Sequence, residues 1–273
     1  MKFYKIILTV ILLSFSAVQN DVNSQNKETN LFEIIGSDFK ISFYDGLCTF
    51  TSPSRFNGSD WMKTGAVIFT TAAFMNYDKD IRREFSKNHN DTRDKIADAG
   101  NVYGNLITPV VLGTGIYSYG LFFKDDYVRE TGRMIFESVL FSGIITDVTK
   151  IIAGRSRPYT ERGPYFYNMF TFNEGSLSFP SGHATVAFAV SSVLSNRIHN
   201  LYASIGLYTL STVTALSRIY SDKHWASDVV LGSAIGYFVG EYVSSDRKNC
   251  KSKCGVTCKI YPTTNGLGVN LNF

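Results

Sequence analysis

The sequence lacks the features that mark several common classes of protein. Its net charge is only +4 over 273 residues, and no basic stripe is interleaved with aromatic residues, so a nucleic-acid-binding surface is not indicated. It contains no glycine-rich dinucleotide fingerprint, no internal repeat and no low-complexity segment, which argues against a nucleotide-binding Rossmann domain or a repeat array. Histidine is scarce, with four in the chain, so the position of each one carries information.

Long apolar runs are also scarce, and the mean hydropathy is −0.02. Only residues 99–123 clearly meet the length of roughly 20 positions that a membrane-spanning helix needs, and glycine, asparagine and Pro109 interrupt that stretch. The other apolar segments are shorter or carry charges. We therefore favour an envelope protein that is soluble or only partly inserted in the membrane, and a fully embedded bundle is the alternative.

The N-terminus has the pattern of an export signal. Two lysines precede an apolar run from Ile6 to about Val18, and a polar stretch follows. This order is typical of a secretory signal, so we predict that residues 1–24 are a signal peptide and that the mature chain starts between Ala17 and Gln25. An uncleaved anchor helix is the alternative. Export would place the protein in the cell envelope.

The four cysteines gain meaning if the chain is exported, because disulfides persist in oxidising compartments. Cys48 lies near the predicted mature N-terminus, and Cys250, Cys254 and Cys258 lie close together near the C-terminus. A bond from Cys48 to the tail would tie the chain ends together, but sequence alone cannot choose a pairing. A zinc site is less favoured, since no histidine accompanies the tail cysteines, and free cysteines are also possible.

The hydrophobic pattern predicts an all-α fold, a helical bundle of about six helices with short irregular or β-like terminal segments. Residues 25–60 carry turn signals and are expected to be irregular, 61–245 to form the main domain, and 246–273 to form a Cys/Lys-rich tail with a β-like end. The expected helical segments are 64–77 continuing into 78–85, 88–98 as helix or loop, 127–152, 182–195, 201–217 and 225–243.

The first candidate site lies where a helix is expected to end. Lys150 is followed, after six residues, by Arg157 and Pro158, and Gly154 and the proline turn the chain. Lysine supplies a compact charge and arginine a two-pronged clamp, both suited to phosphate oxygens. Arg155 adds a third cation of unknown direction. The alternative is a basic helix end that only offsets the helix dipole.

The second candidate site is the start of an apolar helix at Phe179-Pro-Ser-Gly-His183. Small residues at a helix N-terminus expose backbone N–H groups that bind anions. Gly182 allows an oxyanion to approach closely, the Ser181 hydroxyl can bind a ligand oxygen, and His183 can give a proton to a leaving group. The alternative is an ordinary serine cap beside a histidine whose hydrogen bonds are satisfied.

The third candidate site spans Ser217–Asp228, between two apolar runs. Arg218 can hold an anion, and His224 can be a nucleophile near neutral pH. Asp228 follows His224 by four residues, so a helix starting near Trp225 would let its carboxylate reach back and fix one imidazole nitrogen. A solvated charged turn is the alternative when this stretch is considered alone.

Together, Lys-x6-Arg-Pro, Pro-Ser-Gly-His and Ser-Arg-x5-His-x3-Asp resemble the three-part signature of the type 2 phosphatidic acid phosphatase (PAP2) superfamily. This superfamily also includes bacterial class A acid phosphatases and vanadium haloperoxidases. All three parts occur in order with the family's internal spacings, and the resemblance covers about residues 64–244. It implies a helical phosphatase that hydrolyses a phosphate monoester or pyrophosphate and requires no metal or other cofactor.

The resemblance also implies residue roles. His224 would attack phosphorus and form a phosphohistidine, Asp228 would orient it, and His183 would protonate the leaving group and then activate water. The residues implied to bind phosphate are Lys150, Arg157, Ser181, Gly182 and Arg218.

The substrate implied is a phosphorylated lipid or a small phosphate ester. Candidates are phosphatidate, phosphatidylglycerol phosphate, undecaprenyl pyrophosphate and lipid A phosphates. The loop 159–179 is rich in tyrosine and phenylalanine, which could either meet a lipid surface or close over the bundle as a lid. The competing functions are a non-specific acid phosphatase for soluble esters, a haloperoxidase holding vanadate on His224, and a catalytically silent scaffold or lipid-binding protein.

Overall fold

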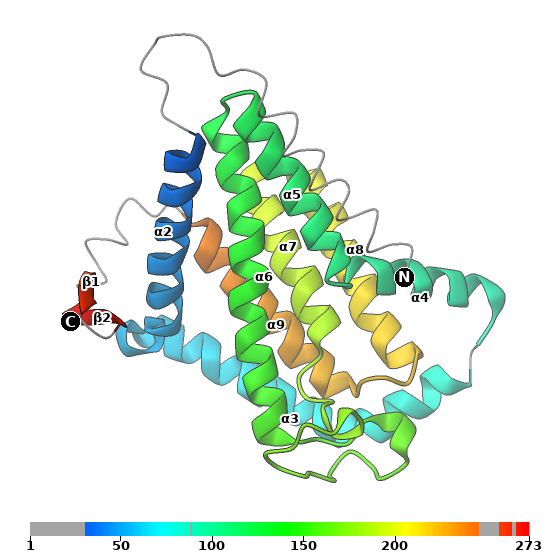
Figure 1. Cartoon of the computed structure of the whole chain (residues 1–273). Coiled ribbons are helices and arrows are strands. Elements are labelled where there is room, and N and C mark those ends of the chain that lie inside the picture. The colour runs from blue at the N-terminus through cyan, green and yellow to red at the C-terminus, as the bar shows by residue number, and fades with distance from the viewer. Residues whose placement is uncertain (1–30, 88, 246–256, 264–265, 273) are drawn as a thin grey trace.

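The computed structural model describes residues 31–87, 89–245, 257–263 and 266–272. Within these ranges the chain forms eight α-helices and one antiparallel β-hairpin (Figure 1). The helices are α2 (Leu31–Phe50), α3 (Gly58–Ser86), α4 (Asp91–Tyr103), α5 (Ile107–Phe122), α6 (Asp126–Ala153), α7 (Gly182–Ile198), α8 (Leu201–Tyr220) and α9 (Ala226–Ser244). The hairpin pairs β1 (Thr257–Thr263) with β2 (Gly266–Asn272).

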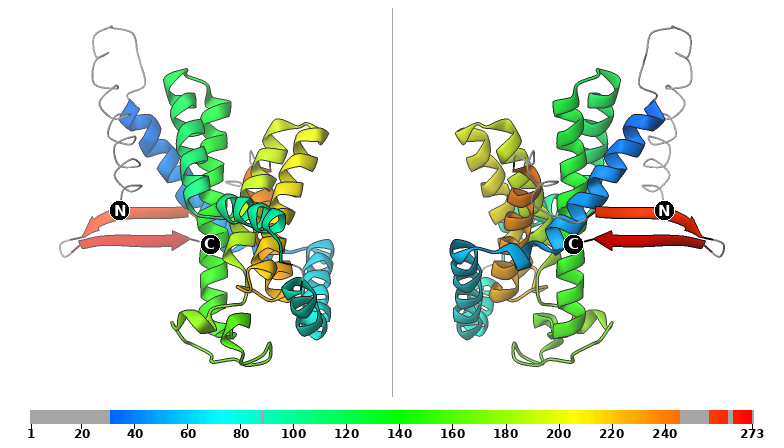
Figure 2. Two further views of the ribbon diagram at one scale, coloured as in Figure 1. Left: turned by 90° about the vertical axis from the view of Figure 1, so that its right-hand side faces the viewer. Right: turned by 90° about the vertical axis from the view of Figure 1, so that its left-hand side faces the viewer.

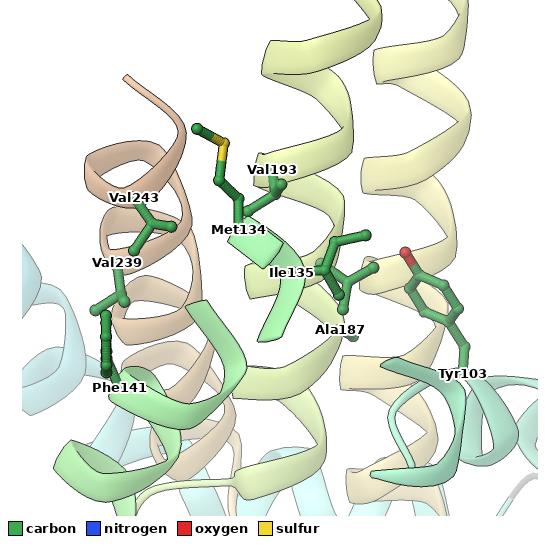
Figure 3. Packing of buried hydrophobic residues seen from close by; sticks show 9 residues of the cluster. Tyr103, Met134, Ile135, Phe141, Ala187, Val193, Val239 and Val243 are labelled. Atoms are coloured by element: carbon green, nitrogen blue, oxygen red, sulfur yellow. The ribbon is translucent and has the colours of Figure 1, made fainter. Parts of the chain in front are cut away.

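The predicted all-α fold is confirmed. Helix α7 lies at the centre and packs against α6, α8 and α9, and apolar side chains from α4, α6, α7 and α9 form one core cluster (Figure 3). Ile135 of α6, Val190 and Val193 of α7 and Val243 of α9 are completely buried. Each such side chain contributes about 1.5–3 kcal/mol when it leaves water, so the core holds these helices in fixed positions.

Asparagine or aspartate side chains cap most of the helix starts. Asn57, Asn90, Asp125 and Asn200 each accept a hydrogen bond from a backbone N–H in the first turn of the following helix, which satisfies donors that a helix start leaves open. Helix α7 differs, because Ser181 at its N-cap makes no side-chain cap bond to any residue that the structure describes. The N–H groups of that helix start are therefore left available.

Glycines let α9 lie directly on the first turns of α7. A Cβ atom placed on Gly232 would lie 2.4 Å from the Ser181 carbonyl oxygen, and one on Gly236 would lie 2.2 Å from that of Thr185. Both distances are too short for any other residue. This close contact fixes the start of α9 beside the start of α7.

The uncharged stretch 99–123 does not form one long helix. Helix α4 ends at Tyr103 and α5 begins at Ile107, with Gly104 between them. A Cβ on Gly104 would lie 2.5 Å from Thr214 Cγ2 and 2.8 Å from the His183 carbonyl oxygen, so the chain turns where it touches α7 and α8. None of the helices in the described ranges meets the combined length and apolarity needed to cross a bilayer.

The prediction that residues 25–60 are irregular is wrong for the described part, because 31–50 form α2 and α3 already starts at Gly58. Helix α2 has an inverted pattern: Asp38 and Asp45 are buried, whereas Phe32 and Phe39 are 73% and 76% exposed. A search for an apolar stripe facing a core cannot recognise such a helix.

Ion pairs fasten α2 to α6. Asp38 lies 3.1 Å from Arg129, and Asp45 lies 3.2 Å from Arg133, which also pairs with Glu137. Breaking a buried pair by removing one partner costs about 3–5 kcal/mol, so these contacts hold the helix in place. Cys48, near the end of α2, is disulfide-bonded, as the sequence allowed.

The remaining expectations for the chain ends differ in outcome. The predicted signal peptide 1–24 lies outside the described residues. No contact among the described side chains identifies the cysteine that pairs with Cys48. The β-like tail is observed as the hairpin β1–β2. Eight α-helices occur in the described ranges rather than about six, because α2 and α5 were not among the expected helical segments, and the expected segment 88–98 is helical from Asp91 onward as part of α4. The domain division at residues 60 and 245 stays a prediction.

The end of α6 depends on a glycine. Gly154 has φ of 58°, its N–H donates to Lys150 O, and a Cβ there would lie 1.7 Å from the Asn168 carbonyl oxygen. The chain after it forms the predicted long loop, 155–179, interrupted by 3₁₀ turns at 158–160 and 174–176.

We predict that Gly154→Ala lowers the free energy of unfolding by more than about 1–2 kcal/mol, since a left-handed backbone alone costs that much for alanine. The matched control is Gly143→Ala in the middle of α6, where a Cβ meets nothing within 4 Å. That change should leave stability equal or slightly higher. Thermal unfolding followed by circular dichroism measures both, and equal stabilities of the two variants would contradict the prediction.

Candidate functional site

The three sequence motifs meet at one end of the bundle. Helices α6 and α8 end there, α7 and α9 begin there, and the loop 155–179 covers that end (Figure 1). Figure 2 shows this loop at the opposite end of the molecule from the turn between α5 and α6. The antiparallel order of the helices therefore brings together residues that are up to 78 positions apart, from Lys150 to Asp228.

Lys150 lies in the last turn of α6 and points toward the start of α7. Its Nζ donates to the Leu177 carbonyl oxygen at 3.3 Å and lies 4.0 Å from where a Cβ of Gly182 would be. Burial lowers the pKa of Lys150 to about 8, and the positive charge of Arg157 contributes. The ammonium is therefore held close to the open N–H groups of α7. Burial and the charge of Arg157 disfavour its charged form, and a negative ligand would offset that effect.

Among the buried donors that have no hydrogen-bond partner within the part of the chain that the structure describes, three lie at this end of the bundle: Arg157 Nε, Ser181 Oγ and Arg218 Nε. Unpaired buried donors cost about 1–3 kcal/mol each, so they are uncommon unless a ligand uses them. They come from all three motifs. Together with Lys150, they form a donor set suited to a tetrahedral oxyanion.

Arg218 is held by a residue that the sequence did not single out. Its Nη1 donates to Asn101 Oδ1 at 2.5 Å, and the neighbouring Ser217 hydroxyl donates to the same oxygen at 3.0 Å. Burial, with Arg157 nearby, lowers the pKa of Arg218 to about 10. Asn101 lies inside the uncharged stretch 99–123, where no local pattern marks it.

His224 is buried and has a defined tautomer. Its Nδ1 lies 2.7 Å from the Ser178 carbonyl oxygen, and a carbonyl can only accept, so Nδ1 carries the proton and Nε2 keeps its lone pair. Burial lowers the pKa of His224 to about 3, and the charges of Lys150 and Arg157 act in the same direction. The imidazole is therefore neutral at pH 7, as a nucleophile requires.

Asp228 approaches His224 less directly than the spacing predicted. Its Oδ2 lies 3.6 Å from His224 Nδ1, beyond a hydrogen bond, and accepts instead from Trp225 N and Ser178 Oγ. Burial alone would raise the pKa of Asp228, but the contacts with His224 and Arg155 and the Ser178 hydroxyl lower it overall. The carboxylate therefore stays charged beside the imidazole.

His183, in the first turn of α7, is the second histidine of the site. Burial lowers its pKa to about 4, followed by the positive charges of Arg218, Lys150 and Arg157. The three cations of the donor set therefore also act on His183. A bound anion would neutralise that field and raise the pKa again.

The sequence left the direction of Arg155 open and missed its partner. Arg155 is completely buried and pairs with Asp228 Oδ1 at 2.6 Å and with Asp78 Oδ2 at 2.8 Å. Asp78 lies on α3, in the charged stretch 78–85 that continues the first expected helical segment, yet it is only 1% exposed. No signal in the sequence distinguishes it from the charged residues around it.

Among the described residues, there is no group of three or more histidine, cysteine, aspartate or glutamate side chains that could hold a metal ion.

The chain is similar to known proteins in the part that contains the three motifs. Residues 132–251 match the family model described as PAP2 superfamily, which confirms the resemblance drawn from the motifs. Over 66 residues the chain is 42% identical to a lipid A 1-phosphatase of Porphyromonas gingivalis, covering 23% of this chain and 15% of that protein. Over 141 residues it is 27% identical to a lipid A 1-phosphatase of Rhizobium etli, covering 50% and 57%. The chain thus spans at most little more than half the length of these relatives.

A solved structure shares the fold. The transmembrane PAP2-type phosphatidylglycerolphosphate phosphatase from Bacillus subtilis aligns with a TM-score of 0.53 over 65% of this chain and 92% of that one, at 17% identity. At this identity the likeness concerns the fold alone. The helical PAP2 architecture is therefore supported by both sequence and structure.

We predict that the site binds sulfate, whose charge is constant near neutral pH, and that binding weakens about 10-fold as the pH rises through 8. Lys150 is charged below its pKa of about 8 and neutral above it, and a hydrogen bond to a charged group is worth about 1.5–3 kcal/mol. Isothermal titration between pH 7 and 9.5 measures the effect.

Two variants complete this experiment. Lys150→Met should bind weakly with no such pH dependence, whereas Lys63→Ala, which removes an exposed lysine paired with Asp60 at 3.9 Å, should behave as wild type. Wild-type affinity that stays constant over the whole pH range would exclude Lys150 as an anion ligand.

Proposed function

Because residues 132–251 match the PAP2 superfamily, we propose that the chain is a metal-independent phosphatase acting through a phosphohistidine. One observation carries the proposal: a neutral, buried His224 with Nδ1 on a carbonyl oxygen lies at the same end of the bundle as a set of unpaired cationic and hydroxyl donors. A nucleophile and an electrostatic clamp are the two components that phosphoryl transfer requires.

In the first step, His224 Nε2 attacks phosphorus and the bond to the leaving oxygen breaks. Lys150, Arg157 and Arg218 hold the equatorial oxygens and stabilise their charge. His183 gives its proton to the leaving oxygen. A bound phosphate offsets the positive field that depresses the pKa of His183, so that the imidazole can be protonated in the complex.

In the second step, His183 takes a proton from water, and the resulting hydroxide attacks phosphorus as the N–P bond breaks. Inorganic phosphate leaves, and His224 and His183 return to their starting states. Asp228 stabilises the positive charge that His224 carries while it is phosphorylated.

The proposed substrate is a phosphorylated lipid of the bacterial envelope, with the active site facing the periplasm. The two relatives compared above are lipid A 1-phosphatases by name. In addition, Phe170 and Phe172 of the loop beside the site are 71% and 80% exposed. Side chains that closed over the bundle as a lid would be buried, so their exposure favours contact with lipid.

We predict that His224→Ala lowers kcat for an activated phosphate monoester by at least about 10⁴-fold, because no other group replaces the attacking nitrogen. Sulfate affinity should remain, since the donors stay in place. The matched control is His199→Asn at the other end of α7; His199 is exposed with φ of 52°, a conformation that asparagine tolerates. Undiminished turnover by His224→Ala would remove the nucleophile assignment.

The same assay identifies the substrate class. Purified protein is offered lipid A, phosphatidate and phosphatidylglycerol phosphate beside soluble esters, with and without vanadate as an inhibitor. Faster turnover of a lipid supports the proposal. Preference for soluble esters indicates an acid phosphatase, halide oxidation with vanadate indicates a haloperoxidase, and no turnover indicates a scaffold.

We predict that Phe170→Ser/Phe172→Ser lowers kcat/KM about 100-fold or more for a lipid phosphate in vesicles and leaves a soluble ester unaffected, because about 1.5–3 kcal/mol of apolar contact is lost per side chain. The control is Phe122→Ser/Phe123→Ser at the opposite end of the bundle, where both rings are also exposed, by 74% and 60%. Equal losses on both substrates would instead indicate a lid.

A further inference from the structure

Arg155 does not belong to the donor set of the anion site, although it lies two residues from Arg157. Its guanidinium is completely buried and all its nitrogens are engaged. Nη1 donates to Asp228 and Ser227, Nη2 to Asp78, and Nε to the Pro164 carbonyl oxygen at 2.8 Å. It is thus directed away from the anion site and toward the first turn of α9.

Aromatic rings enclose this guanidinium. Its central carbon lies 5.8 Å from the ring centres of Trp225 and Phe179 and 5.9 Å from that of Tyr167. The rings exclude water and restrict the arginine to one orientation. A planar fork fixed in this way can hold two carboxylates at defined angles, which lysine cannot do.

Asp78 completes the arrangement from α3. Its Oδ1 accepts from the Ser227 backbone N–H at 3.0 Å, and its Oδ2 accepts from the Ser227 hydroxyl at 2.6 Å and from Arg155. It therefore caps the start of α9 from a different helix. Asp78 lies outside residues 132–251, the range that matches the family.

The consequence is that both oxygens of Asp228 are fixed. Oδ1 accepts from Arg155, while Oδ2 accepts from Trp225 N and Ser178 Oγ and lies 3.6 Å from His224 Nδ1. Since the carboxylate does not bond the imidazole directly, its position depends on these other contacts. A rotation of Asp228 would change the charge felt by His224 without moving any anion ligand.

We propose that Asp78 and Arg155 are positioning residues that hold Asp228, and through it His224, in the geometry needed for attack. The proposal rests on the proposed function, in which His224 is the nucleophile. It separates the roles of the two arginines after α6: Arg157 contacts the anion, and Arg155 orders the nucleophile.

The test uses Arg155→Lys, Asp78→Asn and the double variant Asp78→Asn/Arg155→Gln. The double variant removes one positive and one negative charge, so the buried net charge is unchanged while Asp228 loses its counter-ion. We expect kcat to fall at least about 10-fold in each variant, with KM and sulfate affinity within about twofold of wild type. Rates are expressed per site that binds sulfate, which corrects for any unfolded fraction.

The pH profile separates positioning from a merely structural role. Without Arg155, the pKa of Asp228 rises, so the acid limb of kcat/KM in the double variant should move up by about one pH unit or more. The other charged groups that act on the His224–Asp228 pair, Lys150 and Arg157, are unchanged. As control, Asp80→Asn/Arg83→Gln removes an exposed pair of 2.8 Å on the same helix and should change neither kcat nor the limb.

The outcomes are distinct from those of the function test. If His224→Ala is inactive but the double variant keeps wild-type kcat and the wild-type acid limb, the positioning role is wrong and the phosphatase assignment stands. If the variants lose sulfate binding along with turnover, Asp78 and Arg155 support the anion site as a whole, which also overturns the proposal.

Discussion

The structure at the site end depends on one buried guanidinium between two carboxylates. Arg155 joins α3, through Asp78, to the first turn of α9, through Asp228, and its own backbone lies in the loop that follows α6. Removing one member of such a group leaves a buried charge unpaired, at about 3–5 kcal/mol. The arrangement therefore fixes three distant parts of the chain relative to one another. His224, which lies beside Asp228, is positioned by the same contacts.

The residues of the candidate anion site could be singled out from the sequence because each motif carries its own local signal. Lys150 and Arg157 flank a helix end marked by glycine and proline, and Ser181 and Gly182 open an apolar helix. The residues that position Arg218 and Arg155 could not be predicted. Asn101 and Asp78 act through contacts 117 and 77 positions away along the chain, and neither type of contact leaves a periodic pattern.

The fold was predictable where helices bury apolar side chains and unpredictable where they do not. Helices α6 to α9 follow the expected ranges closely, because their apolar faces are buried in two core clusters, one joining α6, α7 and α9 and one that includes α8. Helix α2 buries carboxylates against arginines of α6 and exposes its phenylalanines. The rule that apolar side chains mark the buried face of a helix therefore fails for α2. The uncharged stretch 99–123 is divided between α4 and α5, because contact with α7 and α8, rather than hydropathy, turns the chain at Gly104.

Because the site lies at one end of the bundle, the sequence at the two ends of the molecule can vary to different degrees. The turns at the far end, Lys124–Asp125 between α5 and α6 and His199–Asn200 between α7 and α8, contribute no residue to the anion site. Surface turns of this kind accept insertions readily. The bundle can therefore gain length, or be fused to another domain, at the far end while its chemistry stays unchanged.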